Sequence, residues 1–184
     1  PHMRVADCAY NASEIKKQIT EAVQEGVQVI CFPELSITGY TCADLFFTQQ
    51  LQQNALTALE QVCAYTRDLP IIVLVGAPLK VDNNLYNCAF VITDGEVVGI
   101  VPKINLPNTG EFYEKRWFSV EAVSAEPLLF RLPSGVTFGV EICEDLWSAL
   151  PPSSRLATAG ADIILNLSAS DELAGKHQYL LSLL

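Results

Sequence analysis

The sequence predicts an α/β protein in which helices cover a mixed β-sheet. Three observations favour this class: helical patterns lie at both ends of the chain, two β-hairpin patterns lie in its middle, and short apolar runs separate them. Hairpins join antiparallel strands whereas helical connections join parallel ones, so both strand directions are expected. The 184 residues are 50% hydrophobic and 17% charged, which is a globular composition large enough for one core.

The first half of the chain alternates between helix and strand. Asn11–Ser13 can cap a helix that Gly26 ends, and the apolar run 27–32 predicts a short buried strand. A second helix is predicted over 43–66, and the run IIVLV at 71–75 predicts another buried strand. The apolar residues that share one face of the first helix are Ile15, Ile19 and Val23.

Two hairpins are predicted in the middle of the chain. Segments 85–93 and 96–101 flank Asp94-Gly95, a dipeptide typical of two-residue β-turns. Segments 128–132 and 136–142 flank a Pro-Ser-Gly turn in the same way.

The last part of the chain returns to the helix–strand alternation. Pro151-Pro152 can begin a short helix that ends at Gly160, because proline is tolerated in a first helical turn. The run ADIILNL at 161–167 predicts one more buried strand, and 171–184 has a helical pattern.

Composition excludes several classes of function. The net charge is −10, from 21 acidic and 11 basic residues, and no basic stripe offsets it, so a nucleic-acid partner is not expected. No apolar run has the length of a membrane span, and no signal-peptide pattern opens the chain. Glycine-rich phosphate-binding loops do not occur.

Cysteine usage indicates a reducing compartment, which predicts a cytoplasmic protein. The six cysteines form no Cys-x-x-Cys pair, and several lie inside apolar stretches, where a free thiol packs as a small hydrophobic group. No metal site is expected, because the two histidines, His2 and His177, lack ligand-like spacing to any cysteine.

Three reactive residues each follow the end of a predicted strand: Glu34, Lys103 and Cys143. A partly desolvated carboxylate is a candidate general base, and a fixed ammonium can hold an oxyanion. Each residue also has a plainer interpretation, as an exposed glutamate, a lysine that reaches solvent, or a buried structural thiol.

Cys143 lies in GVEICEDLW, between two glutamates, where carboxylates disfavour a thiolate. A Cys–His pair is nearly excluded, since one histidine lies in residues 1–3 and the other beside Lys176 on a predicted helix. If Cys143 is a nucleophile, its base must therefore be a carboxylate assisted by a lysine, and Glu34 and Lys103 meet that requirement.

Together these segments resemble a known family. PELSITGY, PKINLP and EICEDLW resemble the signature segments of the nitrilase (carbon–nitrogen hydrolase) superfamily. FPELSITGYTCADLF, NLPNTGEFYEKRWF, GVEICEDLW and NLSAS, followed by Gly175-Lys176, are similar to the glutaminase domains of glutamine-dependent NAD synthetases. This resemblance implies a nitrilase-type αββα sandwich and a Glu-Lys-Cys triad.

The resemblance implies roles for particular residues. Glu34 would be the general base, Lys103 the oxyanion-stabilising cation and Cys143 the nucleophile. The residues that it places in the glutamine site are Tyr40, Thr109, Glu114, Ser170 and Lys176. Two of these depart from the family pattern: lysine stands at 176 where relatives often carry arginine, and threonine stands at 109 where many carry tyrosine.

The resemblance also sets the expected domain organisation. Residues 1–3 are interpreted as an expression-tag remnant, and 4–184 as a glutaminase domain incomplete on its C-terminal side. The synthetase domain, with its Ser-Gly-Gly-x-Asp-Ser loop, is not in the sequence. No cofactor is expected for this domain, whereas ATP and magnesium belong to the synthetase domain. L-Glutamine, that synthetase domain and further copies of the chain, as a homo-oligomer, are the expected partners.

The function implied is hydrolysis of glutamine, with the ammonia passed to an adenylated nicotinic acid dinucleotide to make NAD. Two alternatives stay open at the level of sequence. One is a stand-alone nitrilase-type amidase that acts on another amide. The other is an inactive truncated module that serves assembly with partner subunits.

Overall fold

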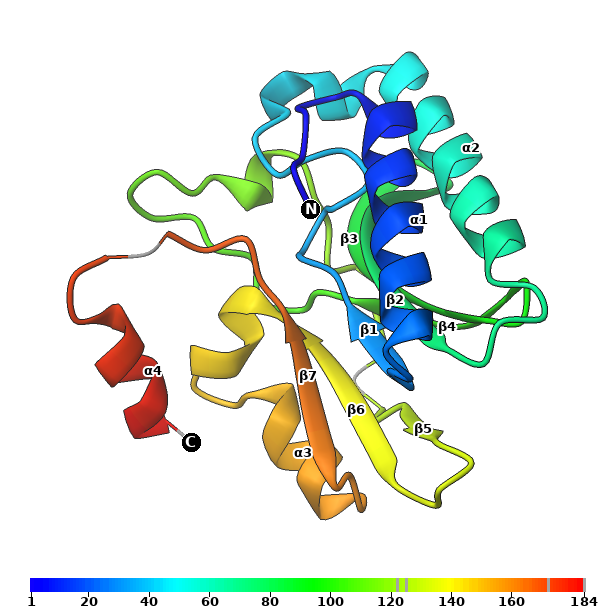
Figure 1. The fold of residues 1–184 in the computed structure, drawn as a ribbon. Helices are drawn as coiled ribbons and strands as arrows, with labels where there is room; N and C mark the ends of the chain where they lie inside the picture. The colour runs from blue at the N-terminus through cyan, green and yellow to red at the C-terminus, as the bar shows by residue number, and fades with distance from the viewer. Residues whose placement is uncertain (122, 125, 172, 184) are drawn as a thin grey trace.

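The computed structural model describes all residues except 122, 125, 172 and 184 (Figure 1). It has two sheets that pack face to face, with helices on their outer sides. The strands are β1 (Val29–Cys31), β2 (Ile72–Val81), β3 (Asn84–Thr93), β4 (Glu96–Pro102), β5 (Leu129–Arg131), β6 (Thr137–Ile142) and β7 (Ile163–Leu167). The helices are α1 (Cys8–Gln24), α2 (Gln49–Tyr65), α3 (Pro152–Thr158) and α4 (Lys176–Leu183), with 3-10 helices η1 (Ala43–Phe47), η2 (Glu114–Arg116) and η3 (Cys143–Trp147).

Both sheets are mixed, as the sequence predicts. The first has the order β1-β2-β3-β4, in which β1 runs parallel to β2 and the other neighbours are antiparallel. The second has the order β5-β6-β7, with an antiparallel and a parallel pair. Both predicted hairpins are confirmed, and the Asp94-Gly95 turn has positive φ at both residues, as a type I′ turn requires.

The two central strands of the first sheet are buried on both faces, because successive side chains of β2 and β3 alternate between two cores. One set packs against α1 and α2: Val73, Val75, Ala77, Cys88, Phe90 and Ile92. The other set packs against the second sheet: Leu74, Ala89 and Val91, opposite Phe138, Val140, Ile142 and Leu167.

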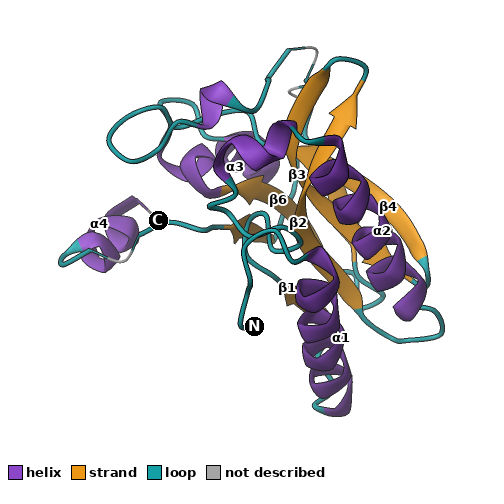
Figure 2. Ribbon diagram, turned by 90° about the horizontal axis from the view of Figure 1, so that it is seen from above, coloured by secondary structure: helices purple, strands orange, loops and turns teal. Residues whose placement is uncertain are grey.

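A helix covers the outer side of the second sheet as well. Leu156 of α3 lies directly on Gly139 of β6, where a Cβ atom would approach its side chain to 2.7 Å. The layers are therefore α1/α2, sheet, sheet and α3, the αββα sandwich implied by the family resemblance (Figure 2). Helix α4 stands away from these layers in both views, and none of its described residues is buried.

The first helix begins earlier than predicted. Asp7 caps α1 by accepting a hydrogen bond from the Tyr10 backbone N–H, so Asn11 lies inside the helix rather than at its cap. The Asn11 side chain is fully buried and donates to the carbonyls of Arg4 and Ile37, which joins the N-terminal segment to the loop after β1.

Other boundaries also differ from the sequence prediction. The helix predicted over 43–66 is divided at Thr48, whose side chain caps α2 after the separate 3-10 helix η1. The helix predicted over 171–184 begins at Lys176, and its predicted residues Glu172 and Leu184 lie outside the described residues. Strand β2 continues six residues beyond the predicted end at Val75, to Val81, because it pairs with β3 as far as Asn84.

Gly76 of β2 allows the loop after β1 to cross the sheet. A Cβ atom at this position would lie 2.2 Å from the backbone nitrogen of Leu35 and 2.8 Å from the carbonyl carbon of Glu34. The Gly76 N–H donates to Ser36 Oγ and its carbonyl accepts from Ile37 N, so the loop is bonded to the strand. Position 76 therefore determines where Glu34 stands.

We expect Gly76→Ala to lower the free energy of unfolding by about 1–3 kcal/mol, because backbone atoms cannot move aside as a flexible side chain can. It should also slow alkylation of Cys143, because Glu34 is displaced. Urea unfolding and mass-spectrometric labelling measure the two effects.

Gly160→Ala is the control for this prediction. Gly160 has a φ of +104° and nothing within 4 Å of a Cβ atom, so alanine there strains only the backbone at the end of α3. That variant should lose stability without slower labelling. Equal labelling rates in both variants would contradict the role given to Gly76.

Candidate active site

Glu34, Lys103 and Cys143 meet at one edge of the two sheets. Glu34 lies in the loop after β1, Lys103 follows the last residue of β4, and Cys143 follows the last residue of β6. All three are buried, with exposed fractions of 2%, 1% and 4%. The Lys103 Nζ donates to Glu34 Oε1 at 2.6 Å, and the charges of Glu34 and Lys103 both act on the Cys143 thiol.

A second carboxylate shares the same ammonium. Lys103 Nζ lies 2.6 Å from Oε1 of Glu114, which is fully buried in η2. Tyr40 donates its hydroxyl to that oxygen at 2.7 Å. Two carboxylates and one ammonium leave the cluster with a formal charge of −1, balanced partly by neutral donors.

The charges of this cluster shape its proton affinities. Burial by itself would lower the pKa of Lys103, but attraction to Glu34 and Glu114 outweighs it and raises that pKa above its usual value. Burial raises the pKa of Glu34, with the charge of Lys103 acting in the opposite direction. Lysine therefore stays an ammonium, while Glu34 has more affinity for a proton than an exposed glutamate.

The Cys143 thiol is neutral at rest. Burial raises its pKa to about 11, the charge of Glu34 adds to the rise, and Lys103 opposes it. Glu34 rather than Glu141 or Glu144 is the carboxylate with the largest effect, although the latter two are closer in sequence. A neutral thiol beside a basic carboxylate can lose its proton to that carboxylate as it attacks an electrophile.

Comparisons with known proteins show the family to which the chain belongs. Residues 1–182 match the carbon–nitrogen hydrolase family. The chain belongs to that family. The glutamine-dependent NAD(+) synthetase of Mycobacterium bovis is 34% identical across 95% of this chain and 28% of its own length.

Solved structures extend the comparison to the fold. The glutamine-dependent NAD+ synthetase from Acinetobacter baumannii superposes with a TM-score of 0.87 at 32% identity, over 96% of this chain and 32% of that chain. An amidase from Nesterenkonia sp. shares the fold, with a TM-score of 0.79 at 19% identity over 97% of this chain and 66% of that one. The resemblance inferred from the motifs is confirmed, and the chain spans less than a third of the curated relatives it matches.

The backbone of Cys143 is held by Asn166, a residue of the NLSAS motif whose role the sequence did not indicate. Asn166 Oδ1 accepts from the Cys143 N–H at 3.1 Å, and its Nδ2 donates to the Cys143 carbonyl and to Glu141 Oε1. Cys143 needs such support because its φ is +48°, which is strained for a residue other than glycine. Glu141, buried in β6, also accepts from Ser153 N.

Asp145 ties the turn that carries Cys143 to the strand end that carries Lys103. Its Oδ2 accepts from Ile142 N, and its Oδ1 accepts from the backbone N–H groups of Ile104 and Asn105. A signal for Asn166 was present in the sequence, since a polar residue in a predicted apolar strand must find buried partners, whereas Asp145 follows the predicted strand 136–142 and carried no such signal. The partners themselves were not predictable.

The predicted glutamine-site residues are only partly brought together. Ser170 and Lys176 meet, because Lys176 Nζ donates to Ser170 Oγ and to the Asp171 carbonyl, and it lies 5.7 Å from the centre of the Trp147 ring. The segment before Ser170 contacts the cluster of Glu34, Lys103 and Cys143, since Ala169 N donates to Glu34 Oε2 at 3.3 Å. Thr109 lies exposed in the loop between β4 and η2, outside the hydrogen-bonded cluster of Glu34, Lys103 and Glu114.

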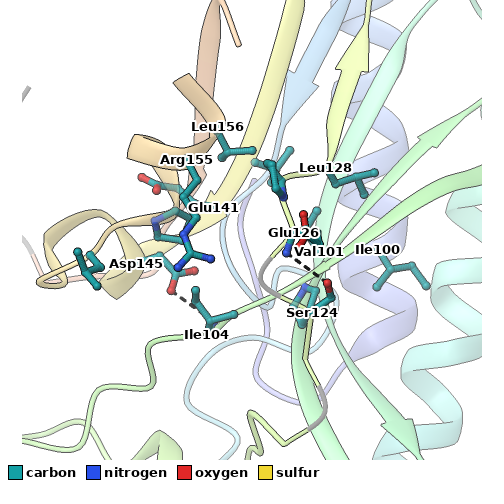
Figure 3. A pocket seen from close by; sticks show the side chains of 15 residues that line it. Ile100, Val101, Ile104, Ser124, Glu126, Leu128, Glu141, Asp145, Arg155 and Leu156 are labelled. Atoms are coloured by element: carbon teal, nitrogen blue, oxygen red, sulfur yellow. Dashed lines mark hydrogen bonds between the residues drawn. The ribbon is translucent and has the colours of Figure 1, made fainter. Parts of the chain in front are cut away.

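A cavity of about 380 Å³ lies behind the nucleophile turn, between β4, β6 and α3 (Figure 3). Its lining is mainly apolar, with Glu141, Asp145 and Arg155 at one side. Glu34, Lys103 and Cys143 do not line it, so this cavity is separate from the cluster that they form.

The described part of the hydrolase holds no group of three or more His, Cys, Asp or Glu side chains with the proximity that a metal ion requires. Within the same residues, no helix has the length and hydrophobicity needed to cross a membrane.

Proposed function

We propose that this domain hydrolyses the side-chain amide of L-glutamine through a thioester on Cys143 and supplies the ammonia for NAD synthesis. The observation that carries the proposal is the buried cluster in which Lys103 bonds Glu34 at 2.6 Å and the neutral Cys143 thiol lies within the influence of both charges. The name of the synthetases that the chain resembles supports glutamine as the substrate.

In the first half-reaction, Glu34 takes the thiol proton as the Cys143 sulfur bonds to the amide carbon. The carbonyl oxygen becomes an oxyanion, held by the Lys103 ammonium and the backbone N–H of Glu144. The Cys143 N–H is occupied by Asn166, so the next N–H along the chain is the donor assigned. The oxyanion then collapses, the C–N bond breaks, and protonated Glu34 gives its proton to the leaving nitrogen, which departs as ammonia.

In the second half-reaction, Glu34 takes a proton from water as the water oxygen adds to the thioester carbon. The C–S bond breaks, and the proton returns from Glu34 to the sulfur. Glutamate leaves, and the resting neutral thiol is restored. One carboxylate thus serves as base and acid in turn, a task that suits its raised pKa.

The proposed glutamine site surrounds the cluster of Glu34, Lys103 and Cys143. Ser170 and Lys176 would bind the α-carboxylate or α-amino end, while Tyr40 and Glu114 would line the pocket and position Lys103. Lysine offers a point charge rather than a bidentate pair, and Thr109 lies exposed outside the hydrogen-bonded cluster. The domain needs no cofactor for this chemistry, and ATP and magnesium would act in a partner synthetase domain within a cytoplasmic homo-oligomer.

An electrophilic glutamine analogue tests the proposal. We expect it to label Cys143 once and to leave the other five cysteines unmodified, because Cys143 alone among the described cysteines lies beside the charges of both Glu34 and Lys103. Intact-mass measurement and peptide mapping report the stoichiometry and the site.

Excess glutamine is the control, since it should slow labelling by the analogue. Labelling of Cys31 or Cys42 in place of Cys143 would contradict the assigned nucleophile. Labelling of Cys143 by a small chloroamide, but not by the glutamine analogue, would favour an amidase acting on another amide. No labelling by either reagent would favour an inactive assembly module.

A further inference from the structure

Asn87 joins the two carboxylates of the candidate site from the middle of the first sheet. It lies in β3, is 1% exposed, and donates through Nδ2 to Glu34 Oε1 at 2.7 Å and to Glu114 Oε2 at 3.4 Å. The backbone carbonyl of Asn87 accepts a hydrogen bond from Lys103 N at 2.8 Å. One residue therefore contacts the base, the second carboxylate and the backbone of the lysine.

We propose that Asn87 is a positioning residue that anchors one oxygen of Glu34 and so reserves the other for proton transfer with Cys143. The proposal rests on the proposed function only in taking Glu34 as the base. It adds that the two oxygens of that carboxylate have different roles, one as an anchor and the other in proton transfer.

The two roles follow from the hydrogen bonds of Glu34. Oε1 accepts two short hydrogen bonds, from Lys103 at 2.6 Å and from Asn87 at 2.7 Å. Oε2 accepts one long bond, from Ala169 N at 3.3 Å. An oxygen that already accepts two strong donors is the poorer base, so Oε2 is the oxygen that exchanges the proton with sulfur.

An amide suits this position better than the alternatives. Aspartate would set a third carboxylate beside Glu34 and Glu114, and leucine would offer no donor. The Asn87 Oδ1 is buried and has no hydrogen-bond partner among the described residues, a costly arrangement that a purely structural asparagine would avoid. The NH₂ group is therefore the part of the side chain that the site uses.

The bond from Asn87 also acts on the proton affinity of Glu34. Burial is the largest influence and raises the pKa of this carboxyl, while the hydrogen bonds from Lys103 and Asn87 lower it. Removal of the Asn87 donor should therefore raise the pKa of Glu34 further. Glu34 would then stay protonated up to a higher pH, and a protonated Glu34 cannot accept the thiol proton.

The test measures how the rate of Cys143 alkylation by iodoacetamide depends on pH in this chain. Glu34→Gln first identifies which limb of the wild-type profile, that is, which pH-dependent rise or fall in alkylation rate, reflects the titration of Glu34. We expect Asn87→Leu to move that limb upward by about one pH unit and to slow labelling about tenfold below it, since one pKa unit is a tenfold change in protonation. With glutamine as substrate, kcat should fall and KM should change little.

Two further variants separate positioning from structure. Asn87→Asp keeps the shape of the side chain and should shift the limb in the same direction, which decides the matter if Asn87→Leu does not fold. Asn11→Leu removes another fully buried asparagine, whose side chain bonds Arg4 and Ile37 and no other described residue, so it should lose stability without shifting the limb.

The outcomes distinguish this proposal from the proposed function. A limb that stays at its wild-type pH in both Asn87 variants overturns the positioning role, whether or not glutamine is hydrolysed. A shifted limb in a protein that does not hydrolyse glutamine supports Asn87 and overturns the proposed substrate alone.

Discussion

Replacing Cys143 with alanine will abolish ammonia release from glutamine, with a loss of about 10⁴-fold or more. No other group in the cluster can take its place, because Glu34 and Glu114 are both bonded to the Lys103 ammonium. Cys143→Ser should fail almost as completely, since the hydroxyl is a weaker nucleophile and has a far higher pKa than the thiol. A coupled assay for ammonia, with the glutamate product measured in parallel, gives the rates.

The fold should survive the alanine substitution. Cys143 makes its backbone bonds to Asn166 through atoms that alanine keeps, and the side chain lost is small. Cys42→Ala is the matched control, since Cys42 is equally buried but donates only to the carbonyls of Thr38 and Gly39. Ammonia release by Cys143→Ala at the wild-type rate would refute the mechanism, whereas loss of activity in Cys42→Ala would point to a different nucleophile.

Local sequence patterns predicted the elements of this fold better than their arrangement. The Asp94-Gly95 turn predicted the β3–β4 hairpin, because that signal acts over a few residues, whereas the β2–β3 hairpin was not predicted. The division into two facing sheets depends on which face each strand buries, and runs such as 71–75 are apolar on both faces. The sandwich was therefore predictable from family resemblance and not from periodicity.

The residues of the candidate site were likewise easier to predict from the sequence than their arrangement in space. Glu34, Lys103 and Cys143 each stood out as a polar or reactive residue after a strand, but only the topology brings the ends of β1, β4 and β6 together. Asn87 and Asn166 were missed, because an asparagine within a strand indicates a buried hydrogen bond without naming its partner.

Replacing Lys103 with methionine will destabilise the protein more than any surface substitution. It leaves Glu34 and Glu114 buried and close together without the ammonium that both of them contact at 2.6 Å. Removal of one partner from a buried ion pair typically costs about 3–5 kcal/mol, and we expect a loss of that size in urea unfolding near pH 8. Lys80→Met, at an exposed position near the end of β2, should change stability by less than about 0.5 kcal/mol.

The loss of unfolding free energy caused by Lys103→Met will become smaller as the pH falls. Burial and the charge of Glu114 already raise the folded-state pKa of Glu34, and the loss of Lys103 removes the main influence that opposes them. A carboxyl whose folded pKa lies above its unfolded value, about 4.3, binds more protons in the folded state, so stability falls as the pH rises between these two values. Unfolding at pH 5 should therefore reveal a smaller difference from the wild type than unfolding at pH 8. A difference that is equal at both pH values would mean that the carboxylates are not left as buried charges, and that Lys103 contributes by packing alone.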